Sequence, residues 1–397
     1  MTDIQTTTAG SLPRTQALIE ANAARTFADD GFTLQSTPEF EQLVADAVDD
    51  VVERQREAGI TLVGDGEFGK AMSNAVDYGA WWSYSFQRAA GLSMTEVNAF
   101  NEPPVRSEPG HIRLTSFLDR RDRQLFPDVY AESVEVGRNA TGFPTTTGPI
   151  TYRGQEAVAS DIRHLKASLR EGEQGFLTAI APGSAARVRN EYYATDEEHI
   201  WAWADALREE YRAIVDAGLI LQLDDPSLAE NFDQINPEPS IADYQAFTKI
   251  RIDAINHAIA GLPKEQVRLH LCWGSWHGPH TTDIELRHIL PVVLGANVGS
   301  ISFEAGNVRH EHEHTVWGEV AVPDDLVLVP GVVSHATNVV EHPDLVAQRI
   351  GRFADIVGAD RVIASTDCGL GGRIHPDLAW AKLASLGEGA RRAAARA

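Results

Sequence analysis

The sequence predicts one α/β domain, a single (β/α)8 TIM-type barrel spanning residues 1–397, with an irregular excursion over the barrel mouth. Three observations support this fold class. Short apolar runs alternate with longer amphipathic ones, which is typical of βαβ units with parallel strand pairing. Polar side chains follow the ends of several apolar runs. The chain has 397 residues, 43% of them hydrophobic, and α/β barrels reach this length as one unit.

The predicted elements follow one another in the order that a barrel requires. Helix-like periodicity precedes an apolar strand in four places, namely 39–57 before 60–63, 199–217 before 219–223, 241–260 before 267–271, and 348–357 before 362–364. Two more strands are predicted at 300–303 and 326–329. Gly218 is expected to end the helix before it, because glycine readily adopts the left-handed conformation found at helix C-termini. Residues 84–130 have the least regular pattern and are predicted to form the excursion.

Composition excludes several classes of partner and compartment. There are 34 basic and 57 acidic side chains, a net charge of −23, so a phosphate-binding surface for nucleic acid is not expected. No run approaches the roughly 20 apolar residues of a membrane span. The first residues lack the basic segment and apolar run of a signal peptide. Two cysteines cannot form a disulfide framework, which fits a cytoplasmic protein with both thiols free. The oligomeric state stays open.

Residues able to carry chemistry cluster where predicted strands end. Asp224-Asp225, His270 with Cys272, Glu304, His335 and Asp367-Cys368 all lie at or just after such ends. In a barrel of parallel strands the C-terminal ends form the face that carries the active site. We therefore expect these side chains to meet in one place.

Four of these residues suggest a metal site. His270 and Cys272 are two residues apart on a predicted strand, so their side chains project to the same face. Together with Cys368 and Glu304 they offer two thiolates, one imidazole and one carboxylate, a set that suits zinc better than magnesium or calcium. The alternative is that both cysteines are small buried apolar residues and that His270 is a hydrogen-bonded core histidine.

Written in order, these segments resemble the catalytic domain of cobalamin-independent methionine synthase. The resemblance rests on six motifs that occur in the family's order, namely Thr6–Arg14 (the opening strand and loop), Gly64–Glu67 (the second acidic loop), Thr147–Thr151 (the Gly-Pro loop), Leu221–Pro226 (the acidic strand end), the residues His270, Cys272, Glu304 and Cys368, and Pro330–Asn338. It implies that His270, Cys272, Glu304 and Cys368 are the zinc ligands. It also implies that His335 lies in the segment that carries the proton-donating histidine.

The sequence also departs from the full-length synthase. The chain has no room for the synthase's second, N-terminal barrel-like half, and it reads Asp224-Asp225-Pro226 where methionine synthases usually have Asp-Glu-Pro. The spacing before His335 is one residue shorter. These features are similar to the short single-barrel relatives, which include epoxyalkane:coenzyme M transferase.

The resemblance implies a zinc-dependent methyl or alkyl transferase related to methionine biosynthesis. A free thiol of pKa about 8.5 is mostly protonated at neutral pH, and a zinc ion overcomes this by binding the sulfur as a thiolate. The expected partners are a small thiol acceptor such as homocysteine and a small methyl or alkyl donor such as methyltetrahydrofolate. His335 is the candidate acid for the leaving group. Asp224 and Glu67 are expected to bind a substrate ammonium, and Ser11 its carboxylate.

Other interpretations stay open at this point. Epoxyalkane:coenzyme M transferase-type addition of a thiol to an epoxide would use the same metal. A uroporphyrinogen decarboxylase-like enzyme would need none, and a non-catalytic zinc protein would keep all four ligands. The alternative for Asp224 is a helix cap before Pro226, and that for His335 is a loop residue that binds backbone. The alternating run His310–His314 is interpreted as a solvated loop rather than a second metal site.

Overall fold

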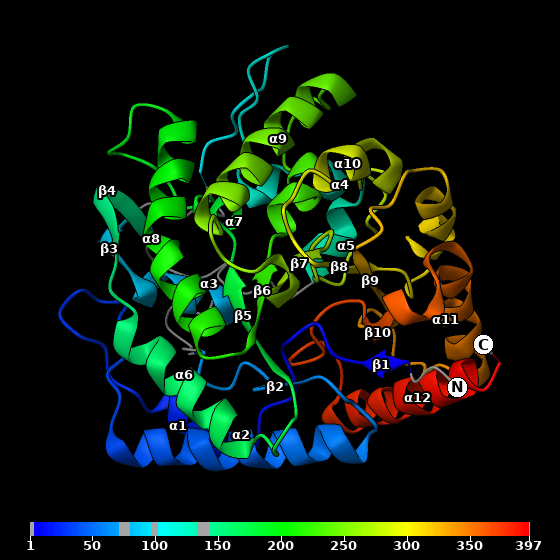
Figure 1. Ribbon diagram of the computed structural model, residues 1–397. Coiled ribbons are helices and arrows are strands. Elements are labelled where there is room, and N and C mark those ends of the chain that lie inside the picture. Colours follow the sequence, from blue (N-terminus) through cyan, green and yellow to red (C-terminus); the bar gives the residue numbers. More distant parts are fainter. Residues whose placement is uncertain (1–3, 71–79, 97–101, 133–142, 397) are drawn as a thin grey trace.

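The computed structural model describes residues 4–70, 80–96, 102–132 and 143–396 (Figure 1). Its main sheet has eight parallel strands in the order β1-β10-β9-β8-β7-β6-β5-β2. These strands are β1 (Gln5–Thr6), β2 (Val63–Gly64), β5 (Gly175–Ile180), β6 (Ile220–Asp224), β7 (Val267–Leu271), β8 (Ser300–Glu304), β9 (Val327–Val333) and β10 (Ile363–Thr366). The first and last strands of this order also meet, because the Leu62 amide beside β2 donates to the Thr6 carbonyl in β1 at 2.9 Å. The curled sheet is the predicted (β/α)8-type barrel.

Helices surround this sheet and bury its outer surface (Figure 1). They are α1 (Gln16–Ala23), α2 (Pro38–Glu57), α6 (Gln155–Ser168), α7 (Pro182–Ala185), α8 (Asp196–Asp216), α9 (Ile241–Ala258), α10 (Leu286–Val293), α11 (Pro343–Val357) and α12 (Pro376–Ala394). Helix α12 packs against β1, β9 and β10, so the last helix covers the first strand. None of the described helices is both long and apolar enough to cross a membrane.

Helix α2 shows how the sequence fixes one edge of the barrel. Thr37 caps its N-terminus by accepting a hydrogen bond from the Phe40 amide, and Pro38 occupies the first turn, where no amide donor is required. Its inward face ends in the buried Gln55, whose amide group bonds both the N–H and the carbonyl of Gly64 in β2. A strand as short as β2 is thus held by a side chain as well as by its neighbour β5.

Most predicted strands are confirmed, and one is displaced along the chain. β7 coincides with the prediction, and Gly218 has the expected positive φ of 82° at the end of α8. The strand predicted at 60–63 is instead β2, Val63–Gly64. Gly64 extends this strand because a Cβ there would lie 2.8 Å from the Phe176 ring, so only glycine lets β2 approach β5 this closely.

The excursion is more regular than predicted. It contains α3 (Ala80–Arg88), β3 (Ala89–Thr95), the short helix η1 (Phe117–Asp119), α4 (Arg121–Leu125) and α5 (Pro127–Glu132). The segment 147–151, interpreted from sequence as a loop, lies within β4 (Phe143–Tyr152), which pairs antiparallel with β3. The loop interpretation was wrong because Gly148 and Pro149 fall at the register shift of this two-stranded sheet, where the chain continues extended.

Candidate active site at the C-terminal face of the barrel

The predicted site residues come together at the C-terminal ends of the barrel strands. Asp224 ends β6 and pairs in register with His270 of β7, which in turn pairs with Ser302 of β8. Glu304 is the last residue of β8. Three further residues follow strand ends by one or two positions, namely Cys272 after β7, His335 after β9 and Cys368 after β10.

Three of the four predicted ligands form one group that suits a metal ion. A ring nitrogen of His270 and the sulfurs of Cys272 and Cys368 lie within 4.8 Å of one another. His270 Nδ1 lies 3.0 Å from Ser302 Oγ, whereas its Nε2 is buried without a hydrogen-bond partner among the described residues. A buried ring nitrogen is rarely left unpaired, and next to two thiols a zinc ion is the fitting partner. The residues present therefore fit the metal that the sequence implies.

Each of the two thiols changes the pKa of the other. The hydrogen bond with Cys368, and after it burial, raise the pKa of Cys272 well above its ordinary value. The pKa of Cys368 is well below its ordinary value, because the neighbouring Cys272 thiol and the nearby His270 ring stabilise its thiolate more than burial opposes it. One sulfur of the pair is thus stabilised as a thiolate, the form that binds zinc.

Glu304, the fourth predicted ligand, lies beside this group rather than in it. Its Oε1 accepts from the Trp273 amide at 3.0 Å and its Oε2 accepts from Asn307 Nδ2 at 2.5 Å. Burial raises its pKa to about 8, and the charge of Cys368 is among the contributions that act in the same direction. The carboxylate is thus electrostatically coupled to the thiol pair.

Glu304 forms a second group with His335 and Asp367. One nitrogen of His335 and one carboxylate oxygen each of Glu304 and Asp367 lie within 4.8 Å of one another. Burial lowers the pKa of His335 to about 4 and raises that of Asp367 to about 7. His335 is 3% exposed, and its Nδ1 has no hydrogen-bond partner among the described residues.

The predicted substrate-binding residues lie on neighbouring strand ends. Glu67 Oε1 accepts from Thr178 Oγ1 at 3.0 Å, and a Cβ on Gly10 would lie 2.5 Å from the same oxygen. Ser11 follows Gly10, and its carbonyl accepts from the Leu370 amide in the loop after Cys368. Glycine at position 10 thus lets the Glu67 carboxylate approach the backbone before Ser11.

Asp224 is not the helix cap. The neighbouring Asp225 has that role, since its side chain accepts from Ser227 at the start of the short helix Pro226–Leu228. Asp224 Oδ1 instead accepts from Gln222 Nε2 at 2.7 Å. Burial raises the pKa of Asp224 to about 7, the charge of Glu67 adds to this, and His270 and Lys70 oppose it.

Sequence reasoning missed two buried cations. Lys70 Nζ lies 3.8 Å from Glu67 Oε1 and donates to the Thr178 carbonyl at 3.0 Å. Arg268 lies on β7 two residues before His270 and is 1% exposed. The alternation of Arg268 with His270 was a signal that could have placed Arg268 inside the barrel. Lys70 offered none, because its partner Thr178 is distant in sequence.

The histidine run is not a solvated loop. Residues Glu311–Gly318 form the short helix η5, and His310 is buried just before it. His310 Nε2 lies 3.1 Å from Asp283 Oδ2, and its Nδ1 lies 2.8 Å from Glu313 Oε2. Its ring stacks on Trp273, with centroids 3.9 Å apart. This histidine therefore orders the backbone beside Cys272.

The excursion is attached to the loop that follows Cys272. Asp122 in α4 accepts from the His280 and Thr281 amides at 3.0 and 2.9 Å, and from Tyr130 Oη at 2.7 Å. Trp276 Nε1 also donates to Tyr130 Oη.

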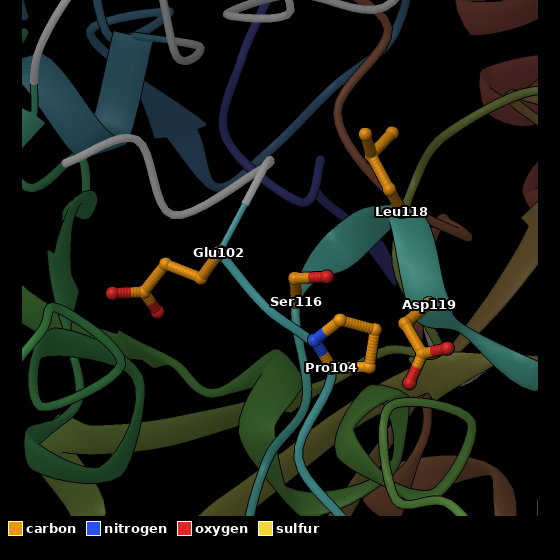
Figure 2. A pocket seen from close by; sticks show the side chains of 5 residues that line it. All are labelled: Glu102, Pro104, Ser116, Leu118 and Asp119. Atoms are coloured by element: carbon orange, nitrogen blue, oxygen red, sulfur yellow. The ribbon is translucent and has the colours of Figure 1, made fainter.

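A cavity of about 270 Å³ lies within the excursion (Figure 2). It is lined by Glu102, Pro104, Ser116, Leu118 and Asp119, none of which is a predicted site residue.

Comparison with known proteins identifies one matching protein family and several similar proteins. Residues 156–391 match the protein family described as the catalytic domain of cobalamin-independent synthase. An uncharacterised Bacillus subtilis protein, YxjH, is 24% identical over 84% of this chain and 81% of its own length. The 2-hydroxypropyl-CoM lyase of Xanthobacter autotrophicus is 23% identical over 88% of this chain and 85% of its own length.

Solved structures show the same fold. A B12-independent methionine synthase from Shewanella sp. W3-18-1, solved in complex with selenomethionine, aligns with a TM-score of 0.70 and 20% sequence identity. The alignment covers 100% of this chain and 99% of that one.

Proposed function

Because the chain belongs to the family of the cobalamin-independent synthase catalytic domain, we propose that it is a zinc-dependent methyl or alkyl transferase whose acceptor is a small thiol. The observation that carries the proposal is the convergence of His270, Cys272 and Cys368 around an unpaired imidazole nitrogen. Two sulfurs and one imidazole nitrogen are a preferred zinc donor set.

We assign zinc binding to His270, Cys272 and Cys368, with Glu304 as the fourth ligand. When bound there, zinc supplies a Lewis acid that keeps the acceptor sulfur deprotonated at neutral pH. Ser302 orients the His270 ring, so Nε2 is the nitrogen available to the metal. Trp273 and Asn307 hold the Glu304 carboxylate at the edge of the site.

His335 is proposed as the proton donor to the leaving group. It lies in one group with Glu304, which places it next to the ligand set, and it follows a different strand. An imidazole there can release a proton to a nitrogen or oxygen that departs from the transferred carbon. Its burial excludes bulk water from this step.

The acceptor proposed first is an amino-acid thiol such as homocysteine. Asp224 and Glu67 offer carboxylates to its ammonium group, and the backbone at Ser11 would meet its carboxylate. Proximity of Lys70 to Glu67 offsets part of this negative charge. The buried Lys70 ammonium group favours a second candidate, in which an anionic thiol such as coenzyme M adds to an epoxide. A relative that is 23% identical to this chain is a 2-hydroxypropyl-CoM lyase.

Two further features belong to this proposal. We propose that residues 1–397 form one domain, because β1 near the beginning pairs with β10 near the end. We also propose that the protein acts in the cytoplasm on small molecules, where Cys272 and Cys368 stay reduced.

A matrix of acceptors and donors tests the function. Zinc-loaded protein is incubated with homocysteine, 2-mercaptoethanesulfonate or 2-mercaptoethanol, each combined with methyltetrahydrofolate, a methyl sulfonium or an epoxide, and products are identified by mass spectrometry. Methylated homocysteine supports the first candidate, whereas a product only from the sulfonate thiol and an epoxide supports the second. Zinc that stays bound with no alkylated thiol from any pair contradicts both and indicates a non-catalytic zinc protein. A metal-free chain would instead favour a decarboxylase-like enzyme.

A further inference from the structure

Asp367 immediately precedes the proposed ligand Cys368 and has no role in the proposed function. It is fully buried, and its Oδ1 accepts from two backbone amides, Ala305 and Gly306, each at 2.8 Å. Its own amide donates to the Val333 carbonyl at 2.9 Å. The carboxylate is therefore fixed from one side by the loop after β8 and the end of β9.

The chain leaves space for this carboxylate. A Cβ on Gly331 would lie 2.5 Å from Asp367 Oδ1 and 2.4 Å from its Cα. A Cβ on Gly306 would lie 3.3 Å from the same oxygen. Glycine at 331, in the middle of β9, is thus required for Asp367 to approach the strand that leads to His335.

Asp367 and His335 each carry one unsatisfied atom in the same group. Asp367 Oδ2 and His335 Nδ1 are buried and have no hydrogen-bond partner among the described residues. The third member, Glu304, has both carboxylate oxygens bonded already, by Trp273 and Asn307. Since buried polar atoms in native proteins are almost always paired, the free oxygen of Asp367 is the natural acceptor for the free nitrogen of His335.

We propose that Asp367 is a positioning residue that accepts the Nδ1 proton of His335, directly or through one water, and so turns Nε2 toward the substrate. This inference rests on the proposed function, in which His335 is the proton donor. For the transfer the ring holds a proton on each nitrogen, the one on Nε2 having come from the acceptor thiol as its sulfur is deprotonated. The Nε2 proton then passes to the departing atom, and the ring is left neutral with its Nδ1 proton still held by Asp367. An Asp that orients and fixes the tautomer of a catalytic histidine in this way is a recurring arrangement.

The tautomer of His335 can be observed without any turnover. Zinc-loaded protein labelled with 15N-histidine is studied by two-bond 1H–15N correlation, and the His335 signals are assigned by their loss in His335→Asn. We expect the wild-type ring to be protonated at Nδ1. In Asp367→Asn the new amide donates to Nδ1, so the proton should move to Nε2.

A matched control separates this effect from general loss of a buried carboxylate. Asp233 is 1% exposed and accepts two hydrogen bonds on Oδ1, while its Oδ2 has no hydrogen-bond partner among the described residues and lies 3.9 Å from Arg120 Nη1, but it holds the excursion. Asp233→Asn should leave the His335 tautomer unchanged. A wild-type ring that is unprotonated at Nδ1, or the same tautomer in wild type and Asp367→Asn, would overturn the proposal. The wild-type spectrum decides the point even if Asp367→Asn fails to fold.

Kinetics give a second, independent readout. With a donor whose leaving group needs a proton, Asp367→Asn should lower kcat by no more than His335→Asn does, and the double variant should be no slower than His335→Asn alone. Additive losses would show that Asp367 acts separately from His335. If His335→Asn itself has no effect on kcat, the proton-donor role in the proposed function fails, and the spectrum still reports whether Asp367 holds the ring.

Discussion

Ser302 Oγ lies 3.0 Å from His270 Nδ1, and this contact leaves Nε2 of the same ring free to face Cys272 and Cys368. The two residues pair in register on β7 and β8, so the contact is built into the barrel rather than into a loop. Sheet geometry thus selects which nitrogen of His270 is offered to a metal.

Ser302→Ala should therefore weaken zinc binding without abolishing it. Groups that orient a metal-bound histidine typically contribute about 10–100-fold to affinity, and we expect a loss in this range. Competition with a chromophoric chelator measures the zinc Kd. Ser302→Thr keeps the hydroxyl and should restore most of the affinity; an alanine variant with wild-type affinity would show that the contact is incidental.

Asp224→Asn should weaken acceptors that carry an amine while leaving zinc content unchanged. Loss of a charge-assisted hydrogen bond worth about 1.5–3 kcal/mol corresponds to a rise of roughly 10–150-fold in acceptor KM. Homocysteine is compared with 2-mercaptoethanol, which lacks the amine and should be unaffected. Asp225→Asn is the matched control, because Asp225 caps the following helix and should not change the preference between the two thiols. Equal losses for both thiols in Asp224→Asn would point to a structural role.

His335→Asn should lower kcat by about 10²–10⁴-fold for a donor whose leaving group must be protonated. Zinc and thiol binding should persist, because His335 is not among the proposed ligands. A sulfonium donor departs without a proton and should largely escape the defect. The comparison of the two donors in wild type and variant is the measurement, and a similar loss on both would mean that the pocket, not a proton transfer, was damaged.

Glu230 should make the fold depend on pH in the acid range. Burial alone would raise the pKa of Glu230, but Arg187 and Arg120 outweigh it and lower the pKa to about 2. A carboxylate with a depressed folded-state pKa contributes stability above its unfolded pKa of about 4.5, and this stability is lost as pH falls from about 4.5 toward 2. The shift corresponds to roughly 3 kcal/mol.

Glu230→Gln should destabilise the protein by about 3–5 kcal/mol at pH 7, because it removes the carboxylate charge that two buried guanidinium groups share. Urea unfolding at pH 7 and pH 3.5 measures both effects. The difference between wild type and variant should shrink at the lower pH. Glu53→Gln, which removes an exposed ion-paired carboxylate, serves as the control and should leave both curves close to wild type. A constant difference at both pH values would contradict the assignment.

The barrel strands and the shared face of His270 and Cys272 could be predicted because their signals are local. Val267–Leu271 alternates between the core and the barrel interior, and His270 with Cys272 shares one face of that strand, so a few adjacent residues determine both. The C-terminal ends of parallel strands lie on one face of the barrel, independent of how the helices pack.

The residues that support the site could not be predicted, because their partners are distant in sequence. Lys70 contacts Thr178, and Asp367 is held by Ala305 and Gly306, pairings that only the closed barrel creates. The extended form of 147–151 was missed for the same reason, since β3 pairs with β4 on both sides of the register shift that contains this segment. Ser302 is one strand away from His270, and only the register between β7 and β8 makes them neighbours.

The most direct test of the account is the zinc content of purified protein and of its two cysteine variants. If His270, Cys272 and Cys368 bind one ion together, elemental analysis should give about one zinc per chain. Cys272→Ser and Cys368→Ser should each lose the metal while circular dichroism shows an intact fold. Two cysteine variants that fold and remain fully loaded with zinc would contradict the metal site at the centre of this proposal.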